Sequence, residues 1–216
     1  MSNSSLVNYT KISPNRNSPR NHDIDTITIH CMAGNLSIES CGNLFASSSR
    51  QASSNYGIGS DGRIAMYVEE KDRAWTSSNS ANDHRAVTIE VANDGGASTN
   101  WHVSDKALAK LIDLCVDICE RNGIKKLNYT GDSSGNLTRH NMFAATDCPG
   151  PYLQSKFPYI ASEVNKRLNG ENSNKGKDSS SSKVNVIYKV RTNGRWLPEV
   201  KNLEDYAGNI GQKITD

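Results

Sequence analysis

The 216-residue sequence lacks any long hydrophobic run, and only 6% of its residues are aromatic. A membrane-spanning helix needs about 20 mostly apolar residues, so we expect no insertion into a membrane. The N-terminal segment has no apolar stretch as long as that of a signal peptide, which predicts synthesis in the cytoplasm without Sec export. Neither charge predominates, with 25 Lys+Arg against 23 Asp+Glu. This balance gives no support for nucleic-acid binding.

Cysteine is scarce, and its five copies do not follow the spacing of a disulfide framework. In a chain without an export signal, an odd number of scattered cysteines predicts reduced thiols. Cys115 and Cys119 lie one helical turn apart within an apolar pattern, so we expect them to pack in a core. Cys148 lies in a different setting, directly before Pro149 and Gly150.

A change in composition divides the chain into two parts. Residues 169–183 contain no apolar residue and are rich in Ser, Asn, Gly and Lys, which is typical of a flexible linker. The linker separates a large domain, residues 1–168, from a small C-terminal segment, residues 184–216. In that segment Asn193-Gly194 lies between apolar residues, which predicts a β-hairpin. The small segment is therefore expected to be of β type.

The large domain combines strand and helix patterns. Alternating, β-branched residues predict strands at 24–31 and 86–92. Apolar spacing predicts a helix from Ser104 to Arg121 and a second helix over 151–168. Weaker patterns predict a short helix at 37–45 and a hairpin with arms at 56–58 and 63–68. Together they predict an α/β domain with a central mixed β-sheet flanked by helices.

Alternation along the two predicted strands places a His and a Glu on the same side of the sheet. Side chains in a strand point to opposite faces in turn, so His30 lies opposite the apolar Ile27 and Ile29. Glu90 likewise lies opposite its apolar neighbours in the second strand. If both strands belong to one sheet with helices on its apolar face, His30 and Glu90 emerge together on the open face. The alternative is a structural role for each of them.

His140 and Cys148 lie eight residues apart in a segment with a Pro-Gly turn. This separation suits a loop that folds back on a metal ion. With His30 they would complete the three-ligand set of a catalytic zinc, whose fourth position is left for water. The alternative interpretation is a buried Cys and a surface His.

Four segments of the sequence resemble a known enzyme family. They are TITIHCMAG (26–34), SSNYGIGSDGRI (53–64), AVTIEVAN (86–93) and TRHNMFAATDCPGPYL (138–153). In this order they are similar to the zinc-dependent N-acetylmuramoyl-L-alanine amidases of the type-2 family. That family includes phage amidase lysozymes, the bacterial muropeptide-recycling amidase and animal peptidoglycan recognition proteins. The resemblance covers about residues 20–168.

The resemblance implies roles for the residues in these segments. His30, His140 and Cys148 would bind one Zn²⁺ per chain on the open face of the sheet. Glu90 stands where the recycling branch has a water-activating Glu. Thr146, two residues before the last ligand, takes a catalytic position that other members fill with Lys or Thr.

Other positions depart from the family or are open to two interpretations. Ser54 stands where the phage branch has a catalytic Tyr, and we expect it to line the cleft together with Asn55. Trp75 falls where the family often has an aromatic residue near the cleft, so it is either a substrate-binding or a core residue. Asp147 lies beside a metal ligand and either supports that ligand or is a solvated loop residue.

The resemblance also implies a function. The chain would be a peptidoglycan hydrolase that cleaves the amide bond between N-acetylmuramic acid and the L-alanine of the stem peptide. The linker and tail favour a phage or prophage endolysin, a monomer that binds bacterial peptidoglycan and acts on the cell wall after release. Two alternatives are a non-catalytic peptidoglycan receptor on the same fold and a Cys-His peptidase that uses Cys148 or Cys31.

Overall fold

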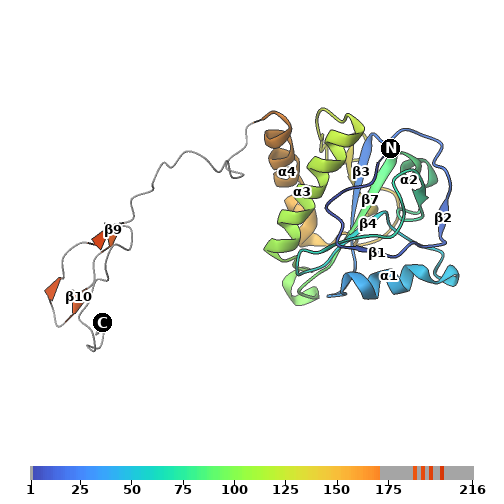
Figure 1. Ribbon diagram of the computed structural model, residues 1–216. Coiled ribbons are helices and arrows are strands. Elements are labelled where there is room, and N and C mark those ends of the chain that lie inside the picture. The colour runs from blue at the N-terminus through green and yellow to red at the C-terminus, as the bar shows by residue number, and fades with distance from the viewer. Residues whose placement is uncertain (1, 171–186, 189–190, 193–194, 197–199, 202–216) are drawn as a thin grey trace. The chain divides into compact units, whose positions relative to one another are not determined.

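The computed structural model describes residues 2–170 and four two-residue strands at 187–188, 191–192, 195–196 and 200–201 (Figure 1). The chain forms two units, residues 1–172 and residues 173–216. The predicted linker at 169–183 lies outside the described residues, apart from Asn169 and Gly170 at the end of the first unit.

The first unit is built on a six-stranded sheet with the strand order β1-β5-β4-β7-β3-β8. The strands β4, β7, β3 and β8 are parallel, and β5 runs antiparallel to β4. The predicted mixed sheet is therefore confirmed. A separate two-stranded sheet joins β2 and β6. The bounds of these strands are β1 Tyr9–Thr10, β2 Arg16–Asn17, β3 Thr26–Cys31, β4 Tyr56–Ile58, β5 Ile64–Met66, β6 Arg73–Ala74, β7 Ala86–Val91 and β8 Leu137–Arg139.

In residues 2–170, four α-helices and three 3₁₀ turns accompany the strands. Ser104 caps the longest predicted helix by accepting a hydrogen bond from the Ala107 backbone, and Gly123 ends it with a φ of 72°. All three predicted helices are present, and the short α2 is an addition. The bounds are α1 Ile38–Ala46, η1 Ser48–Arg50, α2 Ser80–Arg85, η2 Ala97–Thr99, α3 Asp105–Asn122, η3 His140–Met142 and α4 Pro151–Leu168.

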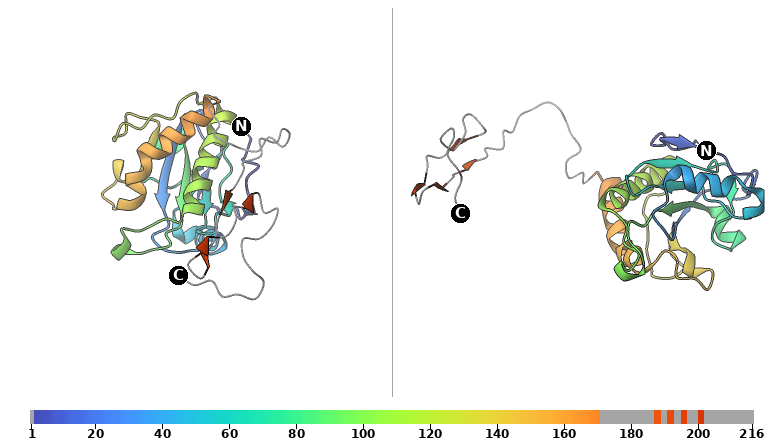
Figure 2. Two further views of the ribbon diagram at one scale, coloured as in Figure 1. Left: turned by 90° about the vertical axis from the view of Figure 1, so that its left-hand side faces the viewer. Right: turned by 90° about the horizontal axis from the view of Figure 1, so that it is seen from below.

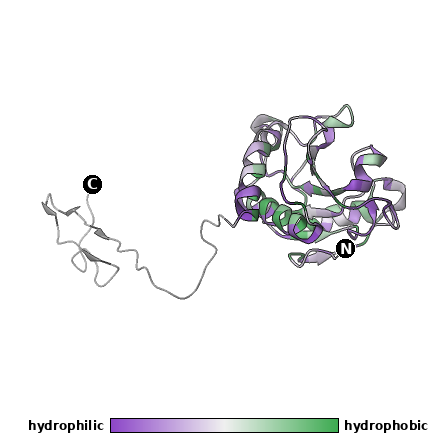
Figure 3. Cartoon of the chain, turned by 90° about the horizontal axis from the view of Figure 1, so that it is seen from above, coloured by the Kyte–Doolittle hydropathy of each residue, from purple (hydrophilic) through white to green (hydrophobic). Residues whose placement is uncertain are grey.

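The main hydrophobic core lies between the sheet and the helices α3 and α4, which pack side by side (Figures 1 and 2). Ile27 and Ile29 from β3 are fully buried in it. Cys115 and Cys119 are also fully buried there as free thiols, as predicted. Hydrophobic and hydrophilic residues alternate along the helices, as expected for helices with one buried face (Figure 3). No helix in the described part combines the length and apolar character needed to cross a membrane.

The opposite face of the sheet is more polar and is only partly covered. A smaller apolar cluster joins α1 to β5, with Ile38, Phe45 and Tyr67 at its centre. Thr28 and Thr88 are fully buried on the central strands β3 and β7. The Thr28 hydroxyl lies 2.9 Å from that of Thr138 on β8. These buried hydroxyl groups on neighbouring strands satisfy each other's hydrogen-bonding capacity, so this face of the sheet can be polar where it is buried.

The second unit is described only through two antiparallel strand pairs. One pair joins β10 (Arg191–Thr192) to β11 (Arg195–Trp196), and the other joins β9 (Ile187–Tyr188) to β12 (Val200–Lys201). The first pair flanks the predicted Asn193-Gly194 turn, which itself lies outside the described residues.

Candidate metal centre

The parallel pairing of β3 and β7 places His30 directly opposite Glu90 in the strand register. This is the juxtaposition that alternation along the two strands predicts. On the other side of β3, β8 ends at Arg139, and His140 begins the 3₁₀ turn η3. Because the carboxyl ends of parallel strands meet at one edge of a sheet, the side chains of His30, Glu90 and His140 gather there.

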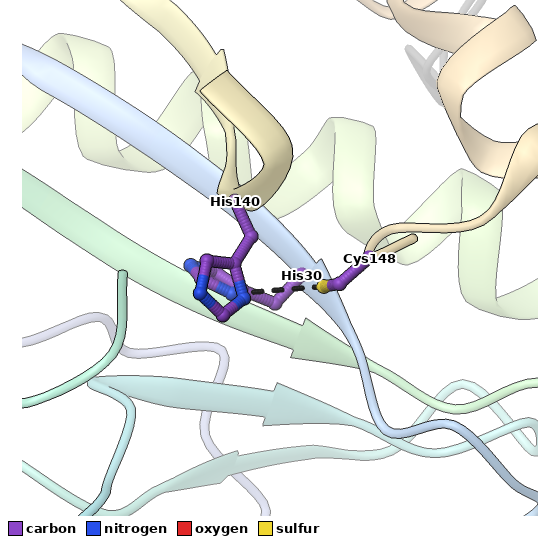
Figure 4. A group of neighbouring side chains, drawn as sticks. All are labelled: His30, His140 and Cys148. Atoms are coloured by element: carbon purple, nitrogen blue, oxygen red, sulfur yellow. Dashed lines mark hydrogen bonds between the residues drawn. The ribbon is translucent and has the colours of Figure 1, made fainter. Parts of the chain in front are cut away.

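His30, His140 and Cys148 form a cluster whose candidate ligand atoms all lie within 4.8 Å of one another. Figure 4 shows the two imidazoles side by side, with the Cys148 sulfur directed at His30. The Sγ atom of Cys148 lies 3.7 Å from Nδ1 of His30. Zinc bond lengths and a tetrahedral angle give a sulfur–nitrogen separation of about 3.6 Å. The donor set, and the separation of Cys148 from His30, therefore fit a zinc ion.

Local backbone interactions hold Cys148 in the cluster. The backbone N–H of Cys31 donates to the Cys148 sulfur at 3.3 Å, and the N–H of Cys148 donates to the Thr146 hydroxyl at 3.2 Å. Gly150 has a φ of 86°, and a Cβ atom there would lie 3.0 Å from the Cβ of Trp101. A glycine is therefore needed where the ligand loop turns into α4.

The electrostatic setting keeps both imidazoles neutral. Burial lowers the pKa of His30 well below its usual value, and the nearby His140 lowers it further. Burial also lowers the pKa of His140. The Nε2 atoms of both rings are buried and have no hydrogen-bond partner in the described part of the chain. The unpaired Nε2 of His140 is suited to bind a cation. On His30 the nitrogen that faces the Cys148 sulfur is Nδ1, so its unpaired Nε2 is a separate buried atom.

The Cys148 thiol needs a cation to ionise. A hydrogen bond with the Cys31 thiol, together with burial, raises the pKa of Cys148. A coordinated metal ion reverses this preference, because a thiol that binds a metal is deprotonated.

Glu90 provides a carboxyl group beside the cluster. Burial raises its pKa well above the usual value, the charge of Cys31 adds to the rise, and the charge of Arg50 opposes it. Its Oε2 atom is buried without a hydrogen-bond partner among the described residues. A carboxylate with a raised pKa accepts a proton more readily near neutral pH.

A pocket of about 340 Å³ opens beside the cluster. Glu90, His140 and Cys148 form one part of its lining, and Thr146 and Trp75 also line it. Side chains from α1 and the segment before it provide an apolar wall that includes Leu36, Leu44 and Phe45. The volume falls within the usual range for small-ligand sites.

Two of the predicted substrate-binding residues lie outside this pocket. Ser54 and Asn55 are fully buried. The Ser54 hydroxyl contacts the backbone oxygens of Tyr56 and Thr88, both at 2.9 Å, and Asn55 accepts a hydrogen bond from the Thr88 N–H. The expectation that they line the cleft is wrong, because their polar groups hold neighbouring strands together. The preceding residue, Ser53, lines the pocket instead.

Trp75 and Asp147, for each of which the sequence leaves two interpretations open, differ in where they lie. Trp75 is half-buried at the pocket, where its indole N–H donates to the Asn17 side chain at 2.7 Å. Asp147 is exposed on the ligand loop. Arg50, an exposed residue at the pocket, is not predicted from the sequence, because a single Arg in a polar loop carries no pattern.

Comparisons with known proteins agree with this arrangement. The model of the N-acetylmuramoyl-L-alanine amidase family matches residues 20–151. The fold is similar to that of *Staphylococcus aureus* hydrolase AmiA, with a TM-score of 0.60, 15% identity and coverage of 79% of this chain and 86% of the other. It is also similar to PlyL, with a TM-score of 0.57, 14% identity and coverage of 73% and 96%.

A third similar structure is the *Clostridium intestinale* endolysin LysCS, an N-acetylmuramoyl-L-alanine amidase. Its TM-score is 0.50 at 20% identity, with coverage of 76% of this chain and 93% of the other. No curated protein matches the sequence.

The fold and the site define a hydrolase of the peptidoglycan amidase class. The chain belongs to the N-acetylmuramoyl-L-alanine amidase family, whose model spans more than half of its length.

Proposed function

We propose that this amidase binds one Zn²⁺ through His30, His140 and Cys148 and uses Glu90 as its general base. The observation that carries the proposal is the strand register that sets Glu90 opposite His30, beside a cluster with the donor set and spacing of a zinc site. The bond hydrolysed is the amide between the lactyl group of N-acetylmuramic acid and the L-alanine of the stem peptide.

The reaction needs help at both ends of the amide bond, since an amide is a weak electrophile with a poor leaving group. When bound, Zn²⁺ would supply a Lewis acid and lower the pKa of a water molecule. Glu90 would accept a proton from the attacking water and return it to the departing nitrogen. Its raised pKa suits both steps, because a carboxyl group that binds a proton near neutral pH can also release it.

Two further pocket residues would assist. The Thr146 oxygen accepts a hydrogen bond from the Cys148 N–H, so its own hydroxyl hydrogen is left to donate to the developing oxyanion. The Trp75 ring, held by Asn17, would provide a flat apolar surface for the substrate.

Zinc content and hydrolysis of purified cell walls, measured on the same preparation, test the proposal. The protein should hold about one zinc ion per chain and lose activity on chelation. Cys148→Ser should lose both zinc and activity, because a hydroxyl rarely ionises at zinc. Cys119→Ser, which changes a buried thiol in α3, should retain zinc. Full activity in a metal-free preparation would exclude this mechanism, and resistance to a chelator would favour the Cys-His peptidase. Absence of turnover with zinc bound would favour the receptor.

We further propose that the chain is an endolysin whose catalytic domain, residues 1–168, is joined by the linker 169–183 to a wall-binding segment, residues 184–216. The composition of the linker and the fold shared with an endolysin support this proposal. Tethering would keep a monomeric enzyme at high local concentration on an insoluble polymer after release to the wall.

Truncation after residue 172 tests the division into domains. We expect residues 1–172 to hydrolyse soluble muropeptides at the rate of the full chain and to bind intact walls more weakly. Equal wall binding by the two proteins would contradict a targeting role for the tail.

A further inference from the structure

Arg50 differs from every other arginine in residues 2–170. The other eight donate side-chain hydrogen bonds to protein groups. No hydrogen bond or ion pair links the Arg50 guanidinium to a described residue. Arg50 is exposed, and it is the only lysine or arginine among the described residues that line the pocket. An unpaired guanidinium at a pocket is available to a ligand.

The backbone that carries Arg50 is fixed by a tight turn. The Arg50 N–H donates to the Ser47 oxygen at 3.1 Å. Gln51 follows with a φ of 50°, in the left-handed region that is uncommon for residues other than glycine. The Gln51 side chain donates to the Ser48 oxygen at 2.8 Å and so closes the turn. The position from which the Arg50 side chain enters the pocket is therefore set before any ligand binds.

The charges around the pocket indicate what Arg50 would bind. Glu90 is the only Asp or Glu among the described lining residues, and Leu36, Leu44 and Phe45 make much of the opposite wall apolar. Apart from the metal ion proposed above, Arg50 is therefore the positive charge that an anionic ligand would meet among the described lining residues. A guanidinium presents parallel N–H donors that match the two oxygens of a carboxylate.

We propose that Arg50 binds a carboxylate of the stem peptide and thereby determines which stem peptides the enzyme cleaves. This inference rests on the proposed function. Arg50 shares a pocket of only about 340 Å³ with the metal ligands, so the group it binds must lie near the scissile amide. In a stem peptide, the first carboxylate after L-alanine is the α-carboxylate of a second residue that is glutamate linked through its side chain. Where that group is converted to a primary amide, the negative charge is lost.

Two soluble muropeptides that differ only in this carboxylate or primary amide test the inference. We expect the unmodified protein to show a kcat/KM about tenfold or more in favour of the carboxylate, in the range for a hydrogen-bonded charged group. Arg50→Gln should bring the ratio near one, mainly through a higher KM for the carboxylate. Arg63→Gln removes the same charge from a residue outside the pocket that pairs with Glu39 at 2.6 Å, so it should keep the preference.

Binding of the same two muropeptides, measured by calorimetry in a Glu90→Gln background, separates this inference from the proposed function. If the protein fails to hydrolyse either compound, the proposed chemistry is wrong, while a tighter Kd for the carboxylate that disappears on Arg50→Gln still supports the role of Arg50. Equal affinity for both compounds, or a preference unchanged by Arg50→Gln, would overturn the inference.

Discussion

The two faces of the central sheet differ in the kind of side chain that they bury, although their side chains alternate along the same strands. On one face Ile29 and its apolar neighbours are sealed beneath α3 and α4. On the other, His30 and Glu90 contain buried polar atoms without hydrogen-bond partners in the described residues. A buried polar group left unpaired costs about 1–3 kcal/mol, so these groups on the second face reduce stability, whereas the apolar side chains on the first face increase it.

This contrast shows how the domain can maintain a reactive site. The free energy gained by apolar burial on one face offsets the cost of holding imidazole, thiol and carboxyl groups close together on the other. One strand, β3, serves both purposes, because its register fixes Ile29 and His30 at the same time. Changes on the apolar face should therefore act mainly on stability, and changes on the polar face mainly on turnover.

The largest expected effect is on turnover at the polar face. Glu90→Gln keeps the size of the side chain and removes the base, so kcat should fall by about 10²–10⁴ while folding and zinc content persist. Glu120→Gln, an exposed residue on α3, is the matched control and should leave kcat unchanged. Near-normal turnover of the Glu90 variant with zinc bound would remove this residue from the mechanism.

The apolar face should respond in stability instead. Phe157 on α4 is fully buried, and its ring centroid lies 5.2 Å from that of Tyr129. Phe157→Ala should lower the free energy of unfolding by about 3–5 kcal/mol. Tyr159→Ala, at a 51% exposed position two residues away, should change it by less than about 0.5 kcal/mol. Denaturant unfolding measures both changes. A loss of zinc from the folded Phe157 variant would show that the two faces are not independent.

The sequence was most informative where a pattern extends over many residues. Periodicity and capping predicted a helix from Ser104 to Arg121, and α3 spans Asp105–Asn122. Alternation predicted the shared side of His30 and Glu90. The short strands β1, β2, β6 and β8 were not predicted, because a segment of two or three residues carries no period. The equally short β4 and the strand β5 were predicted, because an Asp-Gly turn lies between them. Alternation along a strand does not determine the order of the strands. The position of β3 between β7 and β8, which brings Glu90 and His140 next to His30, therefore had to come from the structure.

The pocket lining shows the same limit. Ser53 and Ser54 are chemically identical neighbours, yet only Ser53 lines the pocket, because the Ser54 hydroxyl contacts backbone oxygens on β4 and β7. Arg50 differs from the other arginines of residues 2–170 in that its guanidinium has no hydrogen-bond partner among the described residues, and a sequence does not show which side chains are paired. Such distinctions depend on contacts between segments distant in sequence.

The smallest expected effect is a change in stability that arises from Glu90 in the metal-free protein. Burial raises the pKa of its carboxyl group in the folded state. Below the unfolded pKa of about 4.3 the group is protonated in both states and has no effect. As the pH rises further, the unfolded chain ionises more readily than the folded one, so the folded state loses stability.

Glu90→Gln removes this penalty, so the metal-free variant should be more stable than the metal-free parent protein at pH 7, by an amount on the order of 1 kcal/mol. The difference should shrink to zero as the pH falls toward 4, since only the parent protein titrates there. Melting temperatures of both chelator-treated proteins between pH 4 and 7 measure it. Added zinc should reduce the difference at pH 7, because a cation beside Glu90 stabilises its charged form. A stability difference independent of pH would mean that the Glu90 carboxyl is solvated, and the polar face would then carry one unpaired buried group fewer than the structure indicates.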